Sequence, residues 1–270
     1  MPTTHQRLAQ NSVVFKGTGT RPIMFSHGFG CDQNMWRYVV PRFEADYRVV
    51  LFDHIGAGGS DLTAYDDRRH GSLEGYAEDV LEICRAADLS DVVFVGHSVS
   101  AMIGAIAAGR EPERFRALVM VGPSPRYVND GDYVGGFSRE DIDGLLDSLD
   151  SNYLGWSSAM APAIMGNPDR PEFGEELTNS FCRTDPDIAR KFAHVTFLSD
   201  NRKDLASVRI PTLILQCSDD VIAPDAVGEF VHQNIPGSQL LRLRATGHCP
   251  NLSAPDETSG AIAEFVAALP

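Results

Sequence analysis

The chain has 270 residues, of which 43% are hydrophobic, and its formal net charge is -14 at pH 7. This length and composition predict one substantial buried core, formed either by one large domain or by a core with an insertion. The acidic balance, with no basic run in the sequence, argues against nucleic acid and anionic membrane surfaces as partners.

The N-terminus and the cysteines indicate in which cellular compartment the protein is located. The first seven residues, Met1 to Arg7, lead into no apolar signal core, and no stretch is long enough to span a bilayer, so we expect a cytoplasmic protein. The cysteines are odd in number and lack metal-ligand spacing: Cys31, Cys84, Cys182, Cys217 and Cys249. We expect reduced thiols that pack as small apolar side chains, and no metal or organic cofactor is implied.

The beginning of the chain alternates strands with turns. Residues 12–17 predict an edge strand and residues 17–19 a hairpin turn, before a second, buried strand at 22–26. This strand leads to residues 27–30, where glycines on both sides of Phe29 let its N–H point into a cleft as a donor to an oxyanion. A plain glycine turn is the alternative.

Further helices and strands follow as far as residue 87. A helix is expected over 35–43 and a strand over 47–52. The glycine cluster at 53–61 lacks the lysine of a phosphate-binding loop and the order G-x-G-x-x-G, so it predicts a tight turn. Apolar residues at helical spacing in 72–87 predict a helix packed on the sheet.

The motif with the clearest chemical meaning lies at 92–105. A short apolar run breaks at a glycine, presents one serine and resumes with small residues, which predicts a buried strand turning sharply into a helix with Ser98 at the apex. The motif departs from G-x-S-x-G because Ser100 replaces the second glycine, yet serine is still small enough for a close crossing. Val99, at the start of the helix, would supply a second N–H to an oxyanion. An ordinary helix N-cap serine is the alternative.

After an apolar run at 117–121, the alternation of a parallel, doubly wound sheet stops. Four helical patterns occupy 141–154, 157–165, 172–182 and 186–198, with Ser138 as a cap of the first and Pro186 at the start of the last. A helical stretch between strands of a parallel sheet predicts an insertion that forms a lid over Ser98. Residues that line a pocket, or alternatively form the core of the lid itself, are Phe137, Trp156, Phe197 and Leu198.

The alternation resumes with a strand at 210–216, a helix at 224–233, a strand at 239–243 and a helix at 255–269. Asp219 and Asp220 follow the first of these strands, and His248 lies on a glycine-flanked loop after the second. We therefore expect a core that begins at 1–124, a helical lid at 125–204 and a return to the core at 205–270.

The chain order of serine, aspartate and histidine predicts a serine hydrolase. Each residue follows a predicted strand, so all three meet at the carboxyl edge of a parallel sheet. In such a site His248 takes the proton of Ser98, and an aspartate holds the imidazole in the required tautomer. Asp219 and Asp220 cannot both face His248, because neighbouring side chains leave the backbone in different directions.

Three motifs resemble the RsbQ-like α/β-hydrolases, a group that includes the plant karrikin and strigolactone receptors. The motifs are His27-Gly28-Phe29-Gly30-Cys31-Asp32-Gln33, Gly96-His97-Ser98-Val99-Ser100-Ala101-Met102-Ile103-Gly104 and Gly247-His248-Cys249-Pro250. The resemblance covers nearly the whole chain. It implies an α/β-hydrolase fold, a mostly parallel doubly wound sheet with a four-helix lid insertion. It also favours Asp220, four residues before Pro224, as the acid of the triad.

The resemblance also implies a biological role. Members of the group slowly hydrolyse small apolar ligands, so the expected ligand is a small ester or lactone and the expected role is sensing, with a PAS-domain phosphatase or another signalling protein as partner. A dedicated metabolic carboxylesterase or lactonase without a protein partner is the alternative. A cofactor-free oxygenase or perhydrolase on the same fold is a third.

Overall fold

The computed structural model describes residues 4–269 of the chain. Residues 1–3 and 270, which belong to the N-terminal motif and to the outer limits of the expected core, lie outside the described residues. Within residues 4–269, a single sheet has the strand order β1-β3-β2-β4-β5-β6-β7. Its strands are β1 (Val14–Lys16), β2 (Arg21–Ser26), β3 (Tyr47–Leu51), β4 (Val92–His97), β5 (Phe115–Val121), β6 (Thr212–Ser218) and β7 (Gln239–Thr246).

Every neighbouring pair of strands is parallel except β1 with β3. The central strands β4 and β5 are almost entirely buried. Strands covered on both faces are largely apolar, which is why the sequences of these two consist mainly of apolar residues. The prediction of a mostly parallel, doubly wound sheet is confirmed.

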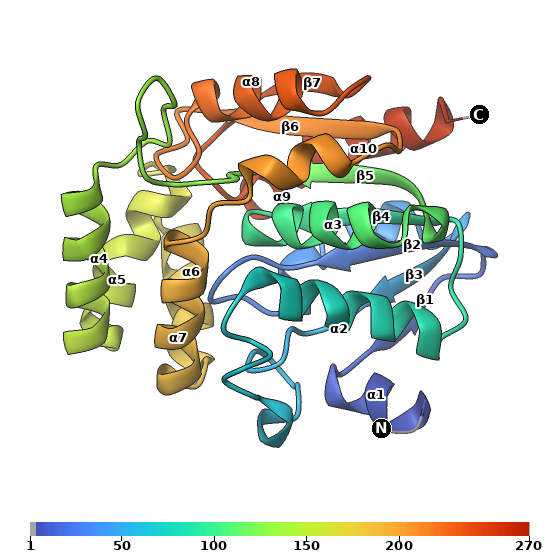
Figure 1. Cartoon of the computed structure of the whole chain (residues 1–270), viewed down its shortest axis with the longest axis horizontal. Coiled ribbons are helices and arrows are strands. Elements are labelled where there is room, and N and C mark those ends of the chain that lie inside the picture. Colours follow the sequence, from blue (N-terminus) through green and yellow to red (C-terminus); the bar gives the residue numbers. More distant parts are fainter. Residues whose placement is uncertain (1–3, 270) are drawn as a thin grey trace.

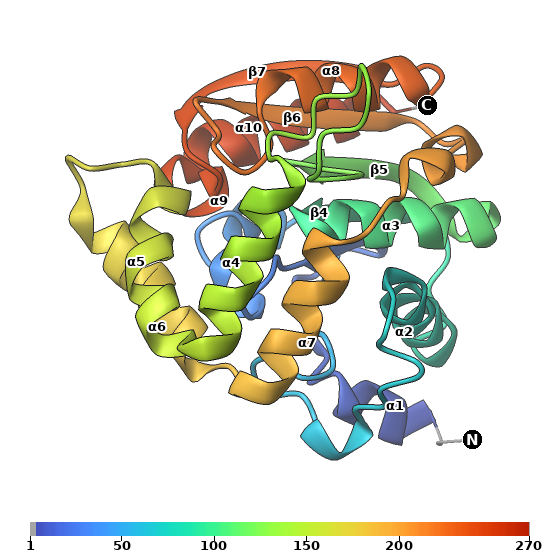
Figure 2. The ribbon, with the colours of Figure 1, turned by 60° about the vertical axis from the view of Figure 1, so that its left-hand side comes forward.

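Helices cover both faces of this sheet, with α2 and α3 side by side on one face and α10 on the other (Figure 1, Figure 2). Outside the segment between β5 and β6, the helices are α1 (Thr4–Gln10), α2 (Leu73–Ala86), α3 (Val99–Arg110), α8 (Asp225–Asn234), α9 (Pro250–Ser253) and α10 (Pro255–Ala267). Short 3-10 turns occupy Gln33–Trp36, Val40–Arg42, Leu62–Ala64, Pro112–Arg114 and Arg202–Ser207. Among the residues that the structure describes, no helix has both the length and the apolar character that crossing a bilayer requires.

The segment between β5 and β6 contains four helices that lie beyond the carboxyl ends of the strands (Figure 1). They are α4 (Arg139–Ser151), α5 (Tyr153–Met165), α6 (Pro171–Arg183) and α7 (Pro186–Phe197). Ser138 caps α4, since its side chain accepts a hydrogen bond from the Asp141 amide while the Asp141 carboxylate accepts one from the Ser138 amide. Pro186 opens α7 directly after the capping residue Asp185, as its fixed φ favours.

The expected hairpin at 17–19 is wrong. β1 pairs antiparallel with β3, and β3 separates it from β2. The glycines serve a close crossing of two chain segments: a Cβ on Gly19 would lie 2.1 Å from the backbone of Asp46, and the Thr18 amide bonds to the carbonyl of Glu44. Gly17 and Gly19 therefore allow close backbone contact with residues 44–47 and do not form a hairpin turn.

The helix expected over 35–43 is also wrong. Two 3-10 turns, Gln33–Trp36 and Val40–Arg42, occupy this stretch. Pro41 lies in the first turn of the second, where its missing N–H is tolerated, but it could not continue an α-helix from the preceding residues. The apolar residues still pack inward, with Trp36 fully buried against Phe25.

Candidate active site

Ser98 lies at the sharp turn between β4 and α3. Its backbone has φ 58° and ψ -124°, a conformation that residues other than glycine rarely adopt. Strand and helix are so close that a Cβ on Gly96 would lie 2.4 Å from the carbonyl oxygen of Ser100. The turn therefore requires a glycine at position 96, whereas position 100 accommodates a serine.

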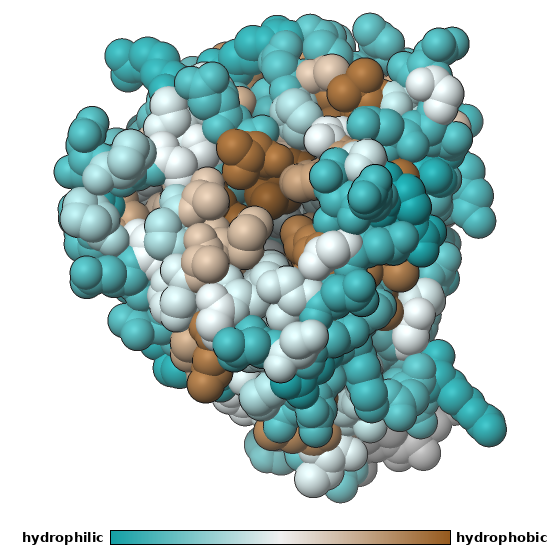
Figure 3. Space-filling view, turned by 90° about the vertical axis from the view of Figure 1, so that its left-hand side faces the viewer, coloured by the Kyte–Doolittle hydropathy of each residue, from teal (hydrophilic) through white to brown (hydrophobic). Residues whose placement is uncertain are grey.

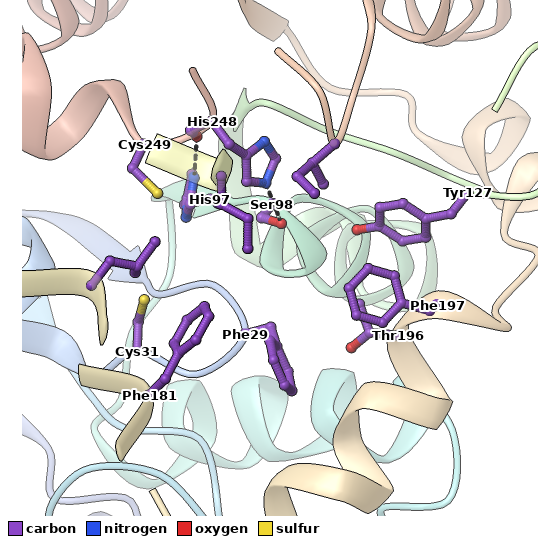
Figure 4. A pocket seen from close by; sticks show the side chains of 13 residues that line it. Phe29, Cys31, His97, Ser98, Tyr127, Phe181, Thr196, Phe197, His248 and Cys249 are labelled. Atoms are coloured by element: carbon purple, nitrogen blue, oxygen red, sulfur yellow. Dashed lines mark hydrogen bonds between the residues drawn. The ribbon is translucent and has the colours of Figure 1, made fainter. Parts of the chain in front are cut away.

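His248 forms hydrogen bonds through both nitrogens of its imidazole. Nε2 lies 2.8 Å from Oγ of Ser98 (Figure 4). Nδ1 lies 2.8 Å from Oδ2 of Asp220. The three side chains come from the β4–α3 turn, the loop after β6 and the loop after β7, and all are buried. A carboxylate next to Nδ1 holds the proton on that nitrogen, which leaves Nε2 able to accept the proton of Ser98.

Asp220 is fixed and ionised by its surroundings. Its Oδ1 accepts hydrogen bonds from the amides of Ile222 and Ala223 at 2.9 and 3.0 Å. Burial opposes ionisation, but the neighbouring His248 and the two amides outweigh it and hold the pKa of this carboxyl below its ordinary value. The adjacent Asp219 is exposed and has φ 51°, so the carboxylate beside His248 belongs to Asp220.

The backbone of His248 is held from two sides. Its amide donates to the carbonyl of Ile164 in α5 at 2.9 Å, and its carbonyl accepts a hydrogen bond of 2.7 Å from Nε2 of His97. Burial, together with the neighbouring His248, lowers the pKa of His97 to about 3, so its ring is neutral with the proton on Nε2. Gly247 touches the end of α5, since a Cβ there would lie 1.8 Å from the Met165 carbonyl oxygen.

The two amides expected to stabilise an oxyanion flank Ser98. Phe29 lies in the turn after β2, and Val99 is the first residue of α3. In residues 4–269 neither N–H donates to a backbone or side-chain acceptor. An amide at a helix start and an amide in a glycine turn are both suited to receive negative charge. Their role as oxyanion donors remains a prediction.

A buried polar network lies behind the serine turn, and the sequence analysis missed it. Oγ of Ser100 lies 2.9 Å from Oγ of Ser26, 2.8 Å from Nε2 of His54 and 2.5 Å from the carbonyl oxygen of His27. Ser100 occupies the position where the usual motif has glycine. The hydroxyl that this departure from the motif introduces is thus hydrogen-bonded to residues on β2 and after β3. These segments are distant in sequence and come together only in the fold.

A small cavity adjoins Ser98 and His248. Its lining residues are Phe29, Cys31, His97, Ser98, Tyr127, Ile164, Leu177, Phe181, Thr196, Phe197, Ile222, His248 and Cys249. The cavity measures about 30 Å³, which is room for one or two water molecules. On the side where the four helices lie, the surface is hollowed and apolar side chains gather at the hollow (Figure 3). An ester therefore fits only if rings or helices around the cavity move.

Of the four pocket residues expected from the sequence, one lines the cavity and three do not. Phe197 lines the cavity, and Trp156 lies behind it, stacked on Phe181 with ring centroids 5.7 Å apart. Leu198 does not line the cavity and is 42% exposed, because it caps α7 one residue after the inward-facing Phe197. Phe137 also lies outside the lining, in the loop whose backbone pairs with Val128.

Several lining residues were not found from the sequence. Phe181 belongs to the buried face of α6, so helical periodicity alone could have marked it. Tyr127 follows β5 at the carboxyl edge of the sheet and points its hydroxyl toward Ser98 (Figure 4). Burial raises the pKa of this phenol, although hydrogen bonding with Ser98 partly offsets the rise. Burial also raises the pKa of the Cys31 thiol to about 12, so Cys31 is protonated and is not a nucleophile.

Comparisons with known proteins find relatives that match nearly the whole chain. A family model described as "Alpha/beta hydrolase family" matches residues 23–261. The Karrikin insensitive 2 receptor CA of Petunia hybrida is 41% identical over 247 residues, which are 91% of this chain and 92% of the receptor. The strigolactone esterase D14 of Arabidopsis thaliana is 38% identical over 252 residues, 93% and 94% of the two chains. A solved structure of a hydrolase from Oleispira antarctica has 40% identity and a TM-score of 0.96 over 99% of this chain and 98% of that one.

Proposed function

The chain belongs to the alpha/beta hydrolase family and is an esterase-type hydrolase with the corresponding fold, and from this premise we propose that it hydrolyses a small apolar ester or lactone through Ser98, His248 and Asp220. The observation that carries the proposal is the pair of hydrogen bonds of 2.8 Å that His248 makes to Ser98 and to Asp220. An imidazole between a hydroxyl and a carboxylate is the arrangement that acyl transfer by serine requires.

The proposed reaction has two halves. Oγ of Ser98 attacks the carbonyl carbon while Nε2 of His248 takes the hydroxyl proton, and the carbonyl π electrons move onto oxygen. When this tetrahedral intermediate collapses, the bond to the alcohol breaks, and the alcohol leaves with the proton from His248. Water then repeats the sequence on the acyl-enzyme and restores Ser98. Asp220 stabilises the imidazolium at each stage.

The amides of Phe29 and Val99 are the proposed donors to the oxyanion. Each such donor contributes about 3 to 4 kcal/mol to stabilisation of the transition state. Both amides are free of other acceptors among the described residues, which supports this role.

The acyl-enzyme gives a direct test. Intact-protein mass spectrometry of samples quenched during turnover of p-nitrophenyl butyrate should show a mass increase of one butyryl group on wild-type protein and none on Ser98→Ala. A butyryl group on the Ser98→Ala protein would place the nucleophile elsewhere and overturn the assignment.

We further propose slow turnover coupled to sensing. The segment 125–204 acts in this proposal as a lid on a core formed by 1–124 and 205–270. Support comes from relatives named karrikin receptors and strigolactone esterases, and from a cavity of about 30 Å³, which must widen before an ester fits. A moving lid presents a different surface when ligand is bound, which a partner recognises. A PAS-domain phosphatase or another signalling protein is the proposed partner, and the free thiols fit a cytoplasmic location.

A metabolic carboxylesterase or lactonase is the second candidate. It is favoured by likeness to the 3-oxoadipate enol-lactonase 1 of Acinetobacter baylyi, which is 26% identical over 94% of this chain. A natural ester hydrolysed with kcat/KM above about 10⁶ M⁻¹s⁻¹, together with no partner captured in any ligand state, decides for this candidate. A cofactor-free oxygenase or perhydrolase would use the same fold, and assays of oxygen uptake and peracid formation distinguish it.

A further inference from the structure

Thr196 presents a buried hydroxyl that has no hydrogen-bond partner. The residue lies in the last turn of α7 and is 1% exposed. Its Oγ1 has no partner among the described residues. A threonine inside a helix ordinarily bonds to the carbonyl four residues earlier, as Thr178 does to Gly174 in α6 at 2.9 Å. Thr196 does not make this bond, so its burial destabilises the free protein.

The residue that carries this hydroxyl belongs to a wall of the catalytic cavity. Thr196 lines the cavity together with Ser98 and His248. Figure 4 shows it beside Phe197, at the end of the cavity away from His248. Two other side chains of the lining, those of Phe29 and Phe197, are hydrocarbon rings and offer no hydrogen bond.

Most other polar groups of the cavity lining are engaged near the catalytic residues. Ser98 and His248 bond to each other, and the hydroxyl of Tyr127 points toward Ser98. Nε2 of His97 donates to the carbonyl of His248. Its Nδ1 has no hydrogen-bond partner among the described residues, but it faces Gly28, where a Cβ would come within 2.7 Å. Thr196 therefore offers a polar contact at the end of the cavity opposite to the catalytic base.

We propose that Thr196 selects substrates that carry a second uncharged oxygen, a hydroxyl or a carbonyl, beyond the ester group that reacts with Ser98. This inference rests on the proposed esterase function and names its substrate class. A threonine hydroxyl both donates and accepts, so it pairs with either type of oxygen. A charged group would be disfavoured, because the cavity lining contains neither an arginine nor a lysine to neutralise a carboxylate.

Kinetics with matched esters test the selection. The probes are p-nitrophenyl butyrate and its 2-hydroxy, 3-hydroxy and 3-oxo derivatives, assayed with wild type, Thr196→Val and Thr196→Ser. One oxygenated probe should exceed butyrate in kcat/KM by about five- to tenfold in wild type. Thr196→Val, which keeps the shape but loses the hydroxyl, should abolish this preference, and Thr196→Ser should keep it. A preference that persists in Thr196→Val, or its absence from the whole panel in wild type, overturns the proposal.

Thermal unfolding of the ligand-free protein supplies a readout independent of activity. If the hydroxyl is unpaired, Thr196→Val removes a destabilising group, and the Tm should rise by about 2 °C. Thr178→Val, which loses a paired hydroxyl in α6, is the matched control and should lower the Tm. A fall in Tm for Thr196→Val shows that its hydroxyl is satisfied within the protein and rejects the proposal.

A binding measurement separates this inference from the proposed function. Ligand-detected NMR compares γ-butyrolactone with α-hydroxy-γ-butyrolactone on Ser98→Ala and on Ser98→Ala combined with Thr196→Val. Tighter binding of the hydroxylated lactone that disappears in the double variant supports Thr196 even if no ester is hydrolysed. Equal binding of the two lactones to Ser98→Ala counts against Thr196, whatever the wild type hydrolyses.

Discussion

The amide of His248 donates a hydrogen bond to the carbonyl of Ile164, which joins the loop of the proposed catalytic base to the end of α5 at 2.9 Å. Gly247 and Gly166 lie against each other at the same contact, where a Cβ on Gly166 would come within 2.8 Å of Gly247 Cα. The position of the histidine thus depends on the helical segment above it as well as on the sheet below. This contact leads to the first prediction.

Gly247→Ala should lower kcat by about a hundredfold or more, because small displacements of a catalytic group have effects of that size. The added methyl would lie 1.8 Å from the carbonyl oxygen of Met165 and must push the loop away from α5. Steady-state kinetics with an aryl ester measures the effect.

Gly237→Ala is the matched control for that variant. Gly237 has φ 74°, close to the 76° of Gly247, but nothing lies within 4 Å of an added Cβ. It therefore carries the same backbone strain, about 1 to 3 kcal/mol in stability, without the clash, and should retain wild-type kcat. Equal losses of kcat in both variants would show that strain alone is responsible.

Ser98→Ala should abolish hydrolysis of short aryl esters while the fold persists. The hydroxyl bonds to His248 and fills no core position, so its removal leaves the packing intact. Circular dichroism and ester turnover are measured together, with Ser158→Ala on the exposed side of α5 as a control. Retention of more than about a tenth of wild-type turnover would be incompatible with a triad acting as a unit.

Asp220→Asn should reduce turnover by about 10³- to 10⁴-fold, because an amide no longer holds the required tautomer of His248. Asp219→Asn should have little effect, since Asp219 is exposed. A kinetic comparison of the two variants measures the difference directly. If Asp219→Asn were the more damaging change, the acid would have been assigned to the wrong residue.

Stability should fall as the pH drops from 6.5 toward 3, in part because of His97. The pKa of this residue is about 3 in the folded protein, below its ordinary 6.5. Between these values the unfolded chain binds a proton that the folded protein does not, so unfolding becomes more favourable as pH falls. Urea unfolding at pH 7.5, 6 and 5 measures this dependence.

His97→Gln isolates the contribution of that ring. Glutamine keeps an N–H donor but does not titrate, so the slope of stability against pH should fall by up to one proton in this window. Burial also holds the pKa of His54 well below its ordinary value, so some of the slope should remain. An unchanged slope in His97→Gln would mean that His97 is not the titrating group.

Turnover of even the best ester should stay well below about 10 per second, the median for enzymes, because a cavity of about 30 Å³ must widen before an ester fits. Limited proteolysis should cut within 125–204 at a different rate when a ligand or an adduct on Ser98 is present. Rapid turnover with unchanged proteolysis would favour the metabolic esterase.

The sequence was sufficient where local pattern and chemistry coincide. β4 and β5 are apolar apart from His97 and Arg116, and the turn that presents Ser98 needs glycine at one position only. His248 was found from chain order and a flanking glycine. Residues close together in the chain determine these features, so they can be predicted from one sequence without an alignment.

What escaped prediction depends on contacts between distant segments. A short strand does not encode its neighbour, so the pairing of β1 with β3 was missed. Periodicity does not determine how a helix is rotated over a cavity, which is why Phe197 lines the cavity and the adjacent Leu198 does not. The sequence does not show that the hydroxyl of Thr196 is unpaired, because hydrogen bonding of this side chain depends on the position of α7 in the fold.

The hydrogen bonds of Ser100 have a consequence for evolution and engineering of this protein. A change to glycine would recreate the common motif, yet it would remove a partner of Ser26 and of His54 in a region closed to solvent. Ser26 and His54 would then keep only the 3.1 Å hydrogen bond between their own side chains. The serine at position 100 thus links three segments that lie far apart in the chain, since it also bonds to the carbonyl of His27.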